Sequence, residues 1–286
     1  MAITLTGLTV YPIKSTRGIP VDEWDVDDFG LQYDRRFMVV DQSGEFLSQR
    51  SHPRLALVAP TIGGAVLRVD APGMRPLALP LEPSPSVATR VTVWEDTCDA
   101  TWMGEAAAQW FSDFLGDFCS LVYMSAVTVR PADPAYGPVG SRVSFADGFP
   151  FLLISEESLA DLNRRLAEPL PMNRFRPNLV VAGAQPYGED QWERIQIGDV
   201  GLRVVKPCAR CVVTTIDQIT TARGREPLRT LATYRNTGGK VMFGQNVVHE
   251  GRGRLRVGDL VHLRASTNPH PERSEGAAQR APGTNQ

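Results

Sequence analysis

The sequence predicts a mainly β protein with short helices, an α+β chain folded into two β-barrel-like domains. Short apolar runs separated by turn residues recur along most of its 286 residues, as in barrels and sandwiches. Helical periodicity is confined to two segments. Hydrophobic residues make up 42% of the chain and charged residues 22%, a balance that supports a globular core and argues against global disorder.

The predicted strands begin near the N-terminus. Residues 3–10 alternate between apolar and polar, and the alternation changes phase at Gly7, which predicts a β-bulge there. Residues 79–87 are rich in proline and predict a loop. Further strands are predicted over residues 37–40, 55–58, 65–69, 91–94, 179–181, 202–205, 212–216, 241–248 and 255–263.

Two helices are predicted between these strands. The first has apolar residues on one face and ends at Gly116. The second begins after Ser155, whose hydroxyl is a good N-cap, with Glu156 and Glu157 in its first turn. The apolar positions that define the two buried faces are Ala107, Trp110, Phe111, Phe114 and Leu115 in the first helix and Leu159, Leu162 and Leu166 in the second.

The pattern of strands and helices predicts a domain boundary near residues 124–128, giving a first domain over 1–124 and a second over 125–265. Residues 266–286 lack apolar periodicity and are predicted to be a disordered tail. A net charge of −2 and a pI of about 6.1 argue against a chain-wide nucleic-acid surface. Since the sequence shows no membrane span, signal-peptide pattern or disulfide framework, a cytoplasmic location is expected.

The segment Lys206-Pro-Cys-Ala-Arg-Cys211 is the sharpest chemical signal. A zinc site, a dithiol redox pair and two small buried side chains are alternative interpretations of its cysteines. Zinc needs about four ligands, and the remaining cysteines and histidines show no short ligand spacing. A redox dithiol expects a strand-to-helix context, whereas strands are predicted on both sides. Lys206 and Arg210 favour a thiolate, the form that binds metals, for at least one cysteine.

Basic residues in predicted turns form a second signal. Most arginines are solvated surface groups. Arg176, however, lies between Phe175 and Pro177 and directly before an apolar strand, so its head group can be held in a pocket. A convergent group of such cations would suit a phosphate or another anion. The set comprises Lys14, Arg36, Arg50, Arg54, Arg174 and Arg176.

The segment Phe243-Gly-Gln-Asn246 is a third signal. Gly244 permits a close approach of the backbone to a ligand. The amides of Gln245 and Asn246 can read the edge of a heterocycle by donating and accepting hydrogen bonds. A strand bulge with two exposed amides is the equally good alternative.

Taken in order, these segments resemble the MOSC family, the C-terminal domain of molybdenum-cofactor sulfurase, preceded by its N-terminal β-barrel partner. The resemblance extends from about residue 5 to residue 263 and implies that the second domain is a MOSC β-barrel. Each motif alone is weak, whereas their order is specific. The motifs are Tyr-Pro-Ile-Lys-Ser, Asp-Arg-Arg-Phe, Val-Trp-Glu-Asp, Ser-Phe-Ala-Asp-Gly-Phe-Pro, Phe-Arg-Pro-Asn, Lys-Pro-Cys-Ala-Arg-Cys, Thr-Thr-Ile-Asp, Phe-Gly-Gln-Asn and Val-Gly-Asp.

The resemblance is greatest to the amidoxime-reducing branch and implies a pyranopterin molybdenum cofactor (Mo-molybdopterin). It implies that Cys211, and not Cys208, is the protein thiolate on the metal, and that Lys14 and Arg36 hold the pterin phosphate. The predicted cofactor-binding residues are Lys14, Arg36, Arg50, Arg176, Asn178, Arg210, Gln245 and Asn246. The predicted catalytic residues are Cys211, Thr214, Thr215 and Asp217.

The implied activity is a two-electron reduction of small N-hydroxylated compounds such as amidoximes. The sequence has no cysteine cluster for an iron–sulfur centre, so a separate electron donor of the ferredoxin, flavoprotein or cytochrome type is expected. No nucleic-acid or membrane partner is expected. The alternative function is a cofactor or sulfur carrier in which Cys211 holds a persulfide and no substrate is reduced. The long N-terminal domain favours the enzyme, because a simple carrier would not need it to clasp the pterin.

Overall fold

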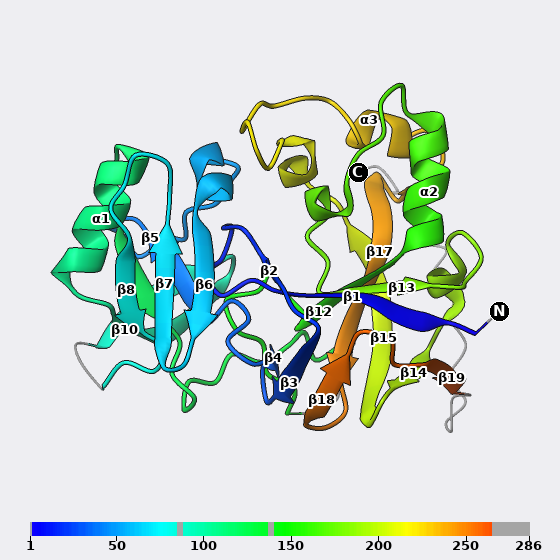
Figure 1. Ribbon diagram of the computed structural model, residues 1–286, viewed down its shortest axis with the longest axis horizontal. Coiled ribbons are helices and arrows are strands. Elements are labelled where there is room, and N and C mark those ends of the chain that lie inside the picture. Colours follow the sequence, from blue (N-terminus) through cyan, green and yellow to red (C-terminus); the bar gives the residue numbers. More distant parts are fainter. Residues whose placement is uncertain (1, 85–87, 137–139, 265–286) are drawn as a thin grey trace, which may run out of the picture.

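The computed structural model describes residues 2–84, 88–136 and 140–264, and the tail predicted over 266–286 lies outside these ranges. The mainly β prediction is confirmed: strands dominate, and the described ranges contain three short α-helices. The strands gather into two lobes, the left and right lobes of Figure 1. None of the described helices has the length and apolarity that crossing a membrane requires.

One large sheet forms the right lobe. Its core includes Leu5, Phe151, Leu179 and Val247, all fully or almost fully buried. In spatial order its strands are β19 (Val261–Arg264), β14 (Arg194–Ile197), β15 (Val200–Ala209), β17 (Lys240–His249), β12 (Phe151–Ser155), β13 (Leu179–Ala182), β1 (Thr4–Val10) and β2 (Ile19–Pro20), with β16 (Asn236–Thr237) paired to β17 off this path.

Two smaller sheets and a helix form the left lobe (Figure 1). The apolar face of α1 (Glu105–Leu115) buries Phe111 and Phe114 against them, as the helical periodicity predicts. One sheet has the order β5 (Phe37–Val40), β11 (Ser120–Tyr123), β10 (Asp96–Trp102) and β9 (Ala88–Val93). The other has the order β6 (Ala59–Gly63), β7 (Val66–Asp70) and β8 (Leu77–Pro80).

The first strands of the chain join the right lobe. Strand β1 pairs with β13, and its register shifts between Leu5 and Gly7, which confirms the predicted bulge. A third small sheet has the order β18 (Gly253–Arg256), β3 (Glu23–Asp27) and β4 (Gly30–Leu31). Residues 4–31 therefore complete sheets whose other strands come from the second half of the chain. The predicted domain boundary between residues 124 and 125 stays a prediction. The turns that follow β1 and β4 run between the two lobes.

Helix α2 (Glu156–Arg165) connects the parallel strands β12 and β13. Its N-cap Ser155 accepts a hydrogen bond from the Ser158 backbone N–H at 3.1 Å, as expected for a helix that starts there. Gly116 ends α1 in the left-handed conformation that glycine favours. The remaining helical elements are α3 (Leu228–Leu231) and the 3-10 turns η1 (Pro53–Leu57), η2 (Met172–Arg174), η3 (Gly188–Gln191) and η4 (Val212–Thr215).

Four predicted segments differ from the structure. Residues 55–58 are not a strand, because Pro53 begins η1 with its ring at the first helical position. Residues 212–216 form η4, because the hydroxyls of Thr214 and Thr215 donate to the carbonyls three residues earlier and close a tight turn. Residues 255–263 divide into β18 and β19, with Gly258 at positive φ between them. The proline-rich segment 79–87 begins within strand β8.

Candidate functional site

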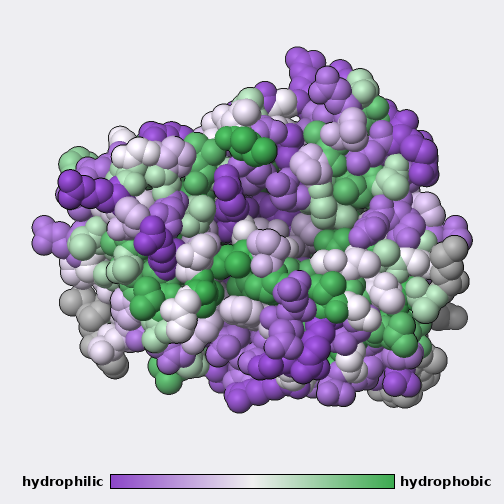
Figure 2. Space-filling view, in the orientation of Figure 1, coloured by the Kyte–Doolittle hydropathy of each residue, from purple (hydrophilic) through white to green (hydrophobic). Residues whose placement is uncertain are grey.

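A pocket lies between the two lobes and is lined by residues from both. Figure 2 shows a hollow between the lobes in which hydrophilic side chains gather. Two cysteines and one carboxylate share the pocket wall with five cationic side chains, a charge excess that suits an anionic ligand. The cations are Lys14, Arg35, Arg50, Arg176 and Arg210, and the other three residues are Cys208, Cys211 and Asp147. We call these five cations the cation wall.

Lys14 enters the pocket from the turn that follows β1. Its buried ammonium donates to the carbonyl of Phe145 at 2.7 Å and pairs with the Asp147 carboxylate at 2.5 Å. Burial lowers the pKa of Lys14, and the Asp147 charge offsets part of that effect. The pocket surroundings oppose ionisation of the Asp147 carboxylate, although its side chain is 63% exposed, but Lys14 outweighs this effect and holds the pKa of Asp147 well below its ordinary value. Asp147 therefore remains ionised at neutral pH, and its charge favours the protonated form of Lys14.

Arg176 offers its guanidinium to the pocket. Its backbone is left-handed, with φ of 57°, which turns the side chain away from the strand that follows. The guanidinium stacks on the Tyr11 ring at 4.4 Å, and among the described residues it has no hydrogen-bond acceptor. Burial lowers the pKa of Arg176 to about 10, so the side chain remains protonated at neutral pH. A half-buried, charged guanidinium that no protein acceptor meets suits an anionic ligand.

Arg35 and Asn178 form the floor of the pocket. Arg35 donates to the Asp34 carboxylate at 2.5 Å and to the Asn178 side-chain oxygen at 2.8 Å. The Asn178 amide also donates to the Thr9 carbonyl and to Asp34. Because its hydrogen bonds are made within the protein, Asn178 fixes the position of Arg35 and of the strand ends around it. The predicted place of Asn178 in the pocket wall agrees with the structure.

Arg36, predicted to hold a phosphate, does not line this pocket. Its buried guanidinium donates to the Met124 carbonyl at 2.8 and 2.5 Å and stacks on Phe29 at 4.3 Å. Arg35 lies in the turn before β5 with a left-handed backbone, φ 48°, and its side chain lines the pocket, whereas the Arg36 side chain contacts Met124 and Phe29 instead. Arg35 thus occupies the place that the sequence interpretation assigned to Arg36.

Cys211 lies where β15 has ended and η4 begins. Its half-buried thiol faces the pocket, and Arg50 from the left lobe donates to the sulfur with 3.3 Å between nitrogen and sulfur. The Arg50 guanidinium stacks on Trp94 at 4.6 Å, and the Trp94 indole N–H lies 3.3 Å from Asp147. A chain of contacts therefore links the thiol to the Lys14 ion pair across the two lobes.

Cys208 and Arg210 line the same pocket but contact each other. Arg210 lies 3.0 Å from the Cys208 sulfur and donates to the Phe175 carbonyl at 2.7 Å. The Arg210 Nε is buried without a partner in the described structure, an N–H available to a ligand. Over the described ranges, no three His, Cys, Asp or Glu residues come together as a metal site, so the zinc interpretation lacks ligands there.

Thr214, Thr215 and Asp217, predicted to be catalytic, lie behind the pocket wall and not in it. The two threonine hydroxyls donate to carbonyls of their own turn. The Asp217 carboxylate accepts from the Thr220 and Ile219 backbone N–H groups, and these hydrogen bonds lower its pKa. These hydrogen bonds hold the loop that presents Cys211, and the catalytic role expected of the three residues stays a prediction.

The two amides of the third signal point in different directions. Gln245 is buried and donates to Asp190 at 2.6 Å, away from the pocket, so its predicted contact with a ligand is absent. Asn246 lines the pocket, and its amide lies 3.4 Å from the Lys206 and Pro207 carbonyls. Side chains alternate along β17, so one of two adjacent amides faces the ligand and the other faces the lobe interior.

The sequence interpretation did not select three residues that the structure brings to this site, namely Arg35, Asp147 and Trp94. Arg35 belongs to the same Asp-Arg-Arg-Phe segment as Arg36, and Asp147 belongs to the segment Ser-Phe-Ala-Asp-Gly-Phe-Pro. Trp94 belongs to Val-Trp-Glu-Asp. Each motif was therefore visible, but nothing local indicated which side chain in it faces the pocket.

Comparisons with known proteins identify the family of this chain. Residues 2–118 match the family described as "MOSC N-terminal beta barrel domain", and residues 140–262 match "MOSC domain". The chain is 36% identical over 279 residues to "Mitochondrial amidoxime-reducing component 1" of Homo sapiens and 38% identical over 281 residues to that of Mus musculus, covering 91% of this chain and 82% of each relative. It is 32% identical to "Molybdenum cofactor sulfurase" of Danio rerio over 86% of this chain and 32% of that protein.

Proposed function

The chain belongs to the family of proteins that join a MOSC N-terminal β-barrel domain to a MOSC domain, and from this premise we propose that it is a molybdenum-cofactor-dependent reductase of N-hydroxylated compounds. The observation that carries the proposal is the meeting of the cation wall with the Cys211 thiol, which lines the pocket and receives a hydrogen bond from Arg50. The relatives named as amidoxime-reducing components support the choice of substrate class.

The residues present fit a pterin phosphate and a thiolate-bound metal. Lys14, Arg35 and Arg176 come from segments other than the cysteine loop and supply positive charge to the pocket. Arg176 lacks a hydrogen-bond acceptor within the described structure. The buried Arg210 Nε can donate to a ligand that enters between the lobes. A thiolate is a suitable ligand for molybdenum because soft metals prefer sulfur.

The cofactor, when bound, supplies the two-electron redox chemistry, and the protein positions it and adjusts its charge. Cys211 would be the protein ligand of the metal, and Arg50 would orient the sulfur. The cation wall would hold the phosphate, while Asp147 keeps Lys14 in place. The overall change consumes two electrons and two protons: one N–O bond breaks, an N–H bond forms, and water leaves.

The direct test uses protein from a host that makes the cofactor. We expect about one molybdenum per chain, and reduction of benzamidoxime to benzamidine when a reduced viologen dye supplies electrons. NADH alone should not drive the reaction. Loaded protein that does not reduce benzamidoxime with the dye, or protein that lacks molybdenum altogether, would contradict the proposal.

A carrier of the cofactor or of sulfur is the second candidate. The relative named as a molybdenum cofactor sulfurase favours it, although the chain corresponds to only 32% of that protein. In this alternative Cys211 holds a persulfide, which mass spectrometry of the native protein would detect as one additional sulfur. A persulfide on Cys211 together with no benzamidoxime reduction would favour the carrier over the reductase.

A further inference from the structure

Four exposed arginines lie within a few residues of groups that line or contact the pocket, without lining it themselves. Arg17 comes from the turn between β1 and β2, and Arg54 comes from the left lobe. The Arg17 backbone N–H donates to the carbonyl of Val58, directly after the η1 turn that contains Arg54. Arg223 and Arg225 come from the segment that follows η4 in the right lobe. All four are exposed, and none forms an ion pair with a carboxylate in the described ranges. We call them the arginine rim.

Hydrogen bonds join the chain segments that carry the arginine rim. The Gln49 side chain donates to the Ser15 carbonyl at 2.7 Å and exchanges hydrogen bonds with Gln218 at 2.9 and 3.1 Å. The Arg223 guanidinium donates to the Arg50 carbonyl at 2.8 Å. Because Arg50 contacts the Cys211 sulfur, the rim lies beside the residue that would bind the metal.

Two apolar side chains lie next to the rim. Val212 follows Cys211 directly and is 53% exposed, and Ile219 at the next turn is 74% exposed. Few large apolar side chains on this chain are as exposed as Ile219, and solvation of such groups is unfavourable. An apolar centre beside a charged, solvent-accessible border is the usual composition of a protein–protein interface.

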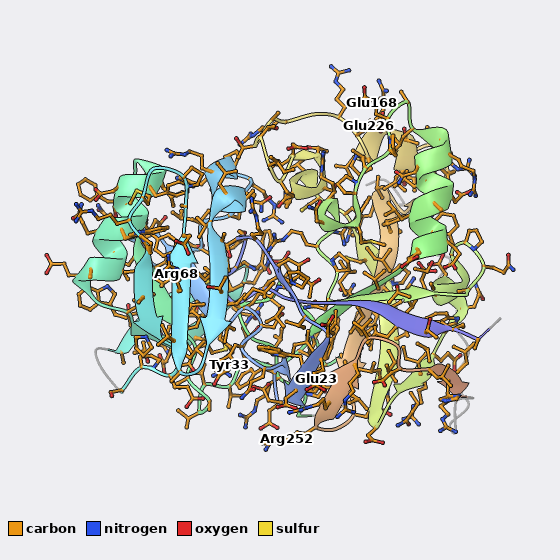
Figure 3. The ribbon with its side chains drawn as sticks, viewed as in Figure 1. Glu23, Tyr33, Arg68, Glu168, Glu226 and Arg252 are labelled. Carbon is orange, nitrogen blue, oxygen red and sulfur yellow. The ribbon has the colours of Figure 1, made fainter. Side chains whose placement is uncertain are left out.

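The acidic residues near the rim do not neutralise it. Asp217 pairs with the buried Arg174, and Glu226 pairs with Arg229. Asp117 lies 3.4 Å from a histidine. The whole chain has a net charge of −2, so the positive potential is local to this face. Figure 3 labels Glu226 at the upper edge of the molecule and Arg252 at the opposite, lower edge.

The reductase proposed above needs electrons from outside the pocket. All four cysteines are free, and no described residues form a cluster that could hold an iron–sulfur centre. We infer that the arginine rim, with Val212 and Ile219, is the docking surface for an acidic one-electron donor protein. Two donor molecules are oxidised by one electron each for every N–OH group that is reduced to N–H and water. Docking here brings the donor beside Cys211, and opposite charge accelerates the encounter.

The test measures electron transfer from a plant-type [2Fe–2S] ferredoxin, an acidic protein, kept reduced by NADPH and its reductase. The test variant Arg17→Glu/Arg225→Glu changes one arginine from the turn between β1 and β2 and one from the segment that follows η4, and it leaves the pocket and the Arg223–Arg50 contact intact. At low salt, we expect its second-order rate constant with ferredoxin to fall about tenfold, within the usual range of electrostatic steering. The wild-type rate should fall with added salt towards that of the variant.

Two controls separate docking from folding and from catalysis. Arg252→Glu/Arg256→Glu makes the same change of charge at the lower edge of the molecule, where both arginines are exposed and form ion pairs. It should keep the wild-type rate with ferredoxin. Reduction of benzamidoxime by a reduced viologen dye, a small cation, should be equal in all three proteins. Oxidised ferredoxin should bind the wild-type protein, and bind the rim variant more weakly, in calorimetry that needs no turnover.

Three results would overturn the inference. One is a rim variant that keeps the wild-type rate and affinity for ferredoxin. Another is loaded enzyme that the dye reduces and ferredoxin does not. The third is binding to anionic lipid vesicles, lost in the rim variant, without any binding of ferredoxin. Loss of dye-driven turnover in the wild-type protein would instead contradict the proposed function, and the calorimetry would still report on the surface.

Discussion

Arg174 and Arg176 are separated by a single residue, yet their guanidinium groups have different surroundings. Arg174 donates to the Thr214 carbonyl at 3.0 Å and lies 3.4 Å from Asp217, so its hydrogen bonds stabilise the loop that presents Cys211. Arg176 has a left-handed backbone and stacks on Tyr11, and no described acceptor meets its N–H groups. Arg176 therefore keeps its N–H groups available in the pocket, and Arg174 uses its own to hold the loop.

The same division applies to other adjacent residues. Arg35 faces the pocket and Arg36 binds the Met124 carbonyl, while Asn246 faces the pocket and its neighbour binds Asp190. A residue type alone does not indicate a ligand contact, because a buried arginine must find acceptors somewhere. For Arg174 and Arg176, what differs is whether those acceptors are already in the protein, whereas Arg35 faces the pocket and still has Asp34 and Asn178 as partners. The following paired substitutions test this division.

The largest effect is expected for the two cysteines. Cys211→Ala removes the thiol that Arg50 contacts and should abolish benzamidoxime reduction while some cofactor remains, because the cation wall is untouched. Cys208→Ala should leave a catalytic metal and cost about 1 kcal/mol of stability, since this side chain is only half-buried. Activity, molybdenum content and thermal unfolding of both variants provide the measurement.

Equal loss of activity in the two cysteine variants, with metal still bound in each, would support a dithiol role and contradict a single ligand. A Cys211→Ala protein with wild-type turnover would exclude the proposed mechanism. Cys208→Ser is a stricter control, because it introduces a hydroxyl beside Arg210 and keeps the size of the side chain.

The second effect concerns Arg176 and Arg174. A charge-assisted contact contributes about 1.5–3 kcal/mol, so Arg176→Ala should weaken cofactor retention by roughly ten- to a hundredfold. The apoprotein should keep its stability, because no internal hydrogen bond is lost. Arg174→Ala should leave the Thr214 carbonyl without its donor and lower the free energy of unfolding by about 1–3 kcal/mol. Molybdenum retention during dialysis and urea unfolding separate the two outcomes. The reverse pattern would contradict the division.

A smaller effect is expected for Arg35 and Arg36. Asp34 already neutralises Arg35, so Arg35→Ala should reduce cofactor retention by less than about tenfold. Arg36→Ala should lower the free energy of unfolding by about 2 kcal/mol, because the buried Met124 carbonyl loses its partner. Retention per folded molecule should be unchanged in Arg36→Ala. If that variant instead folds normally and releases the cofactor, Arg36 is the phosphate ligand that the sequence interpretation selected.

Local patterns predicted most of the fold. Alternation predicted β1 with its bulge, and helical periodicity with Ser155 and Gly116 predicted α1 and α2, because these signals depend on neighbouring residues. The segment 212–216 was misassigned because threonine hydroxyls can bond to their own turn as well as favour a strand.

The site was predicted in part for a similar reason. Lys14, Arg50, Arg176 and Cys211 line the pocket as expected, since each lies in a turn or at a strand end that faces the space between the lobes. Which of Arg35 and Arg36 faces the pocket depends on the Met124 carbonyl, which accepts from Arg36 and lies 88 residues away along the chain. Such a long-range acceptor has no signature in the segment itself, so the sequence could identify the motif but not the side chain.

The smallest effect concerns two carboxylates in acid. Lys14 holds the pKa of Asp147 below the ordinary 3.8, and backbone N–H groups of Thr220 and Ile219 lower the pKa of Asp217. A lowered pKa in the folded state means that the stabilisation is complete above the ordinary value and is lost as the pH falls below it. In Asp217→Asn the asparagine can still accept hydrogen bonds from the two N–H groups and loses a 3.4 Å ion pair with Arg174, whereas Asp147→Asn loses its closer ion pair with Lys14. Because the Asp147 side chain is 63% exposed, water screens that pair to about 1 kcal/mol or less, or about 3 °C in melting temperature. We therefore expect Asp147→Asn to melt slightly lower than wild type at pH 6 and the difference to shrink progressively as the pH falls below 3.8, while Asp217→Asn follows the wild type more closely. Melting curves of the apoproteins between pH 3 and pH 7 make the comparison. A larger effect for Asp217→Asn at pH 6 would mean that the loop, and not the pocket wall, depends on its negative charge.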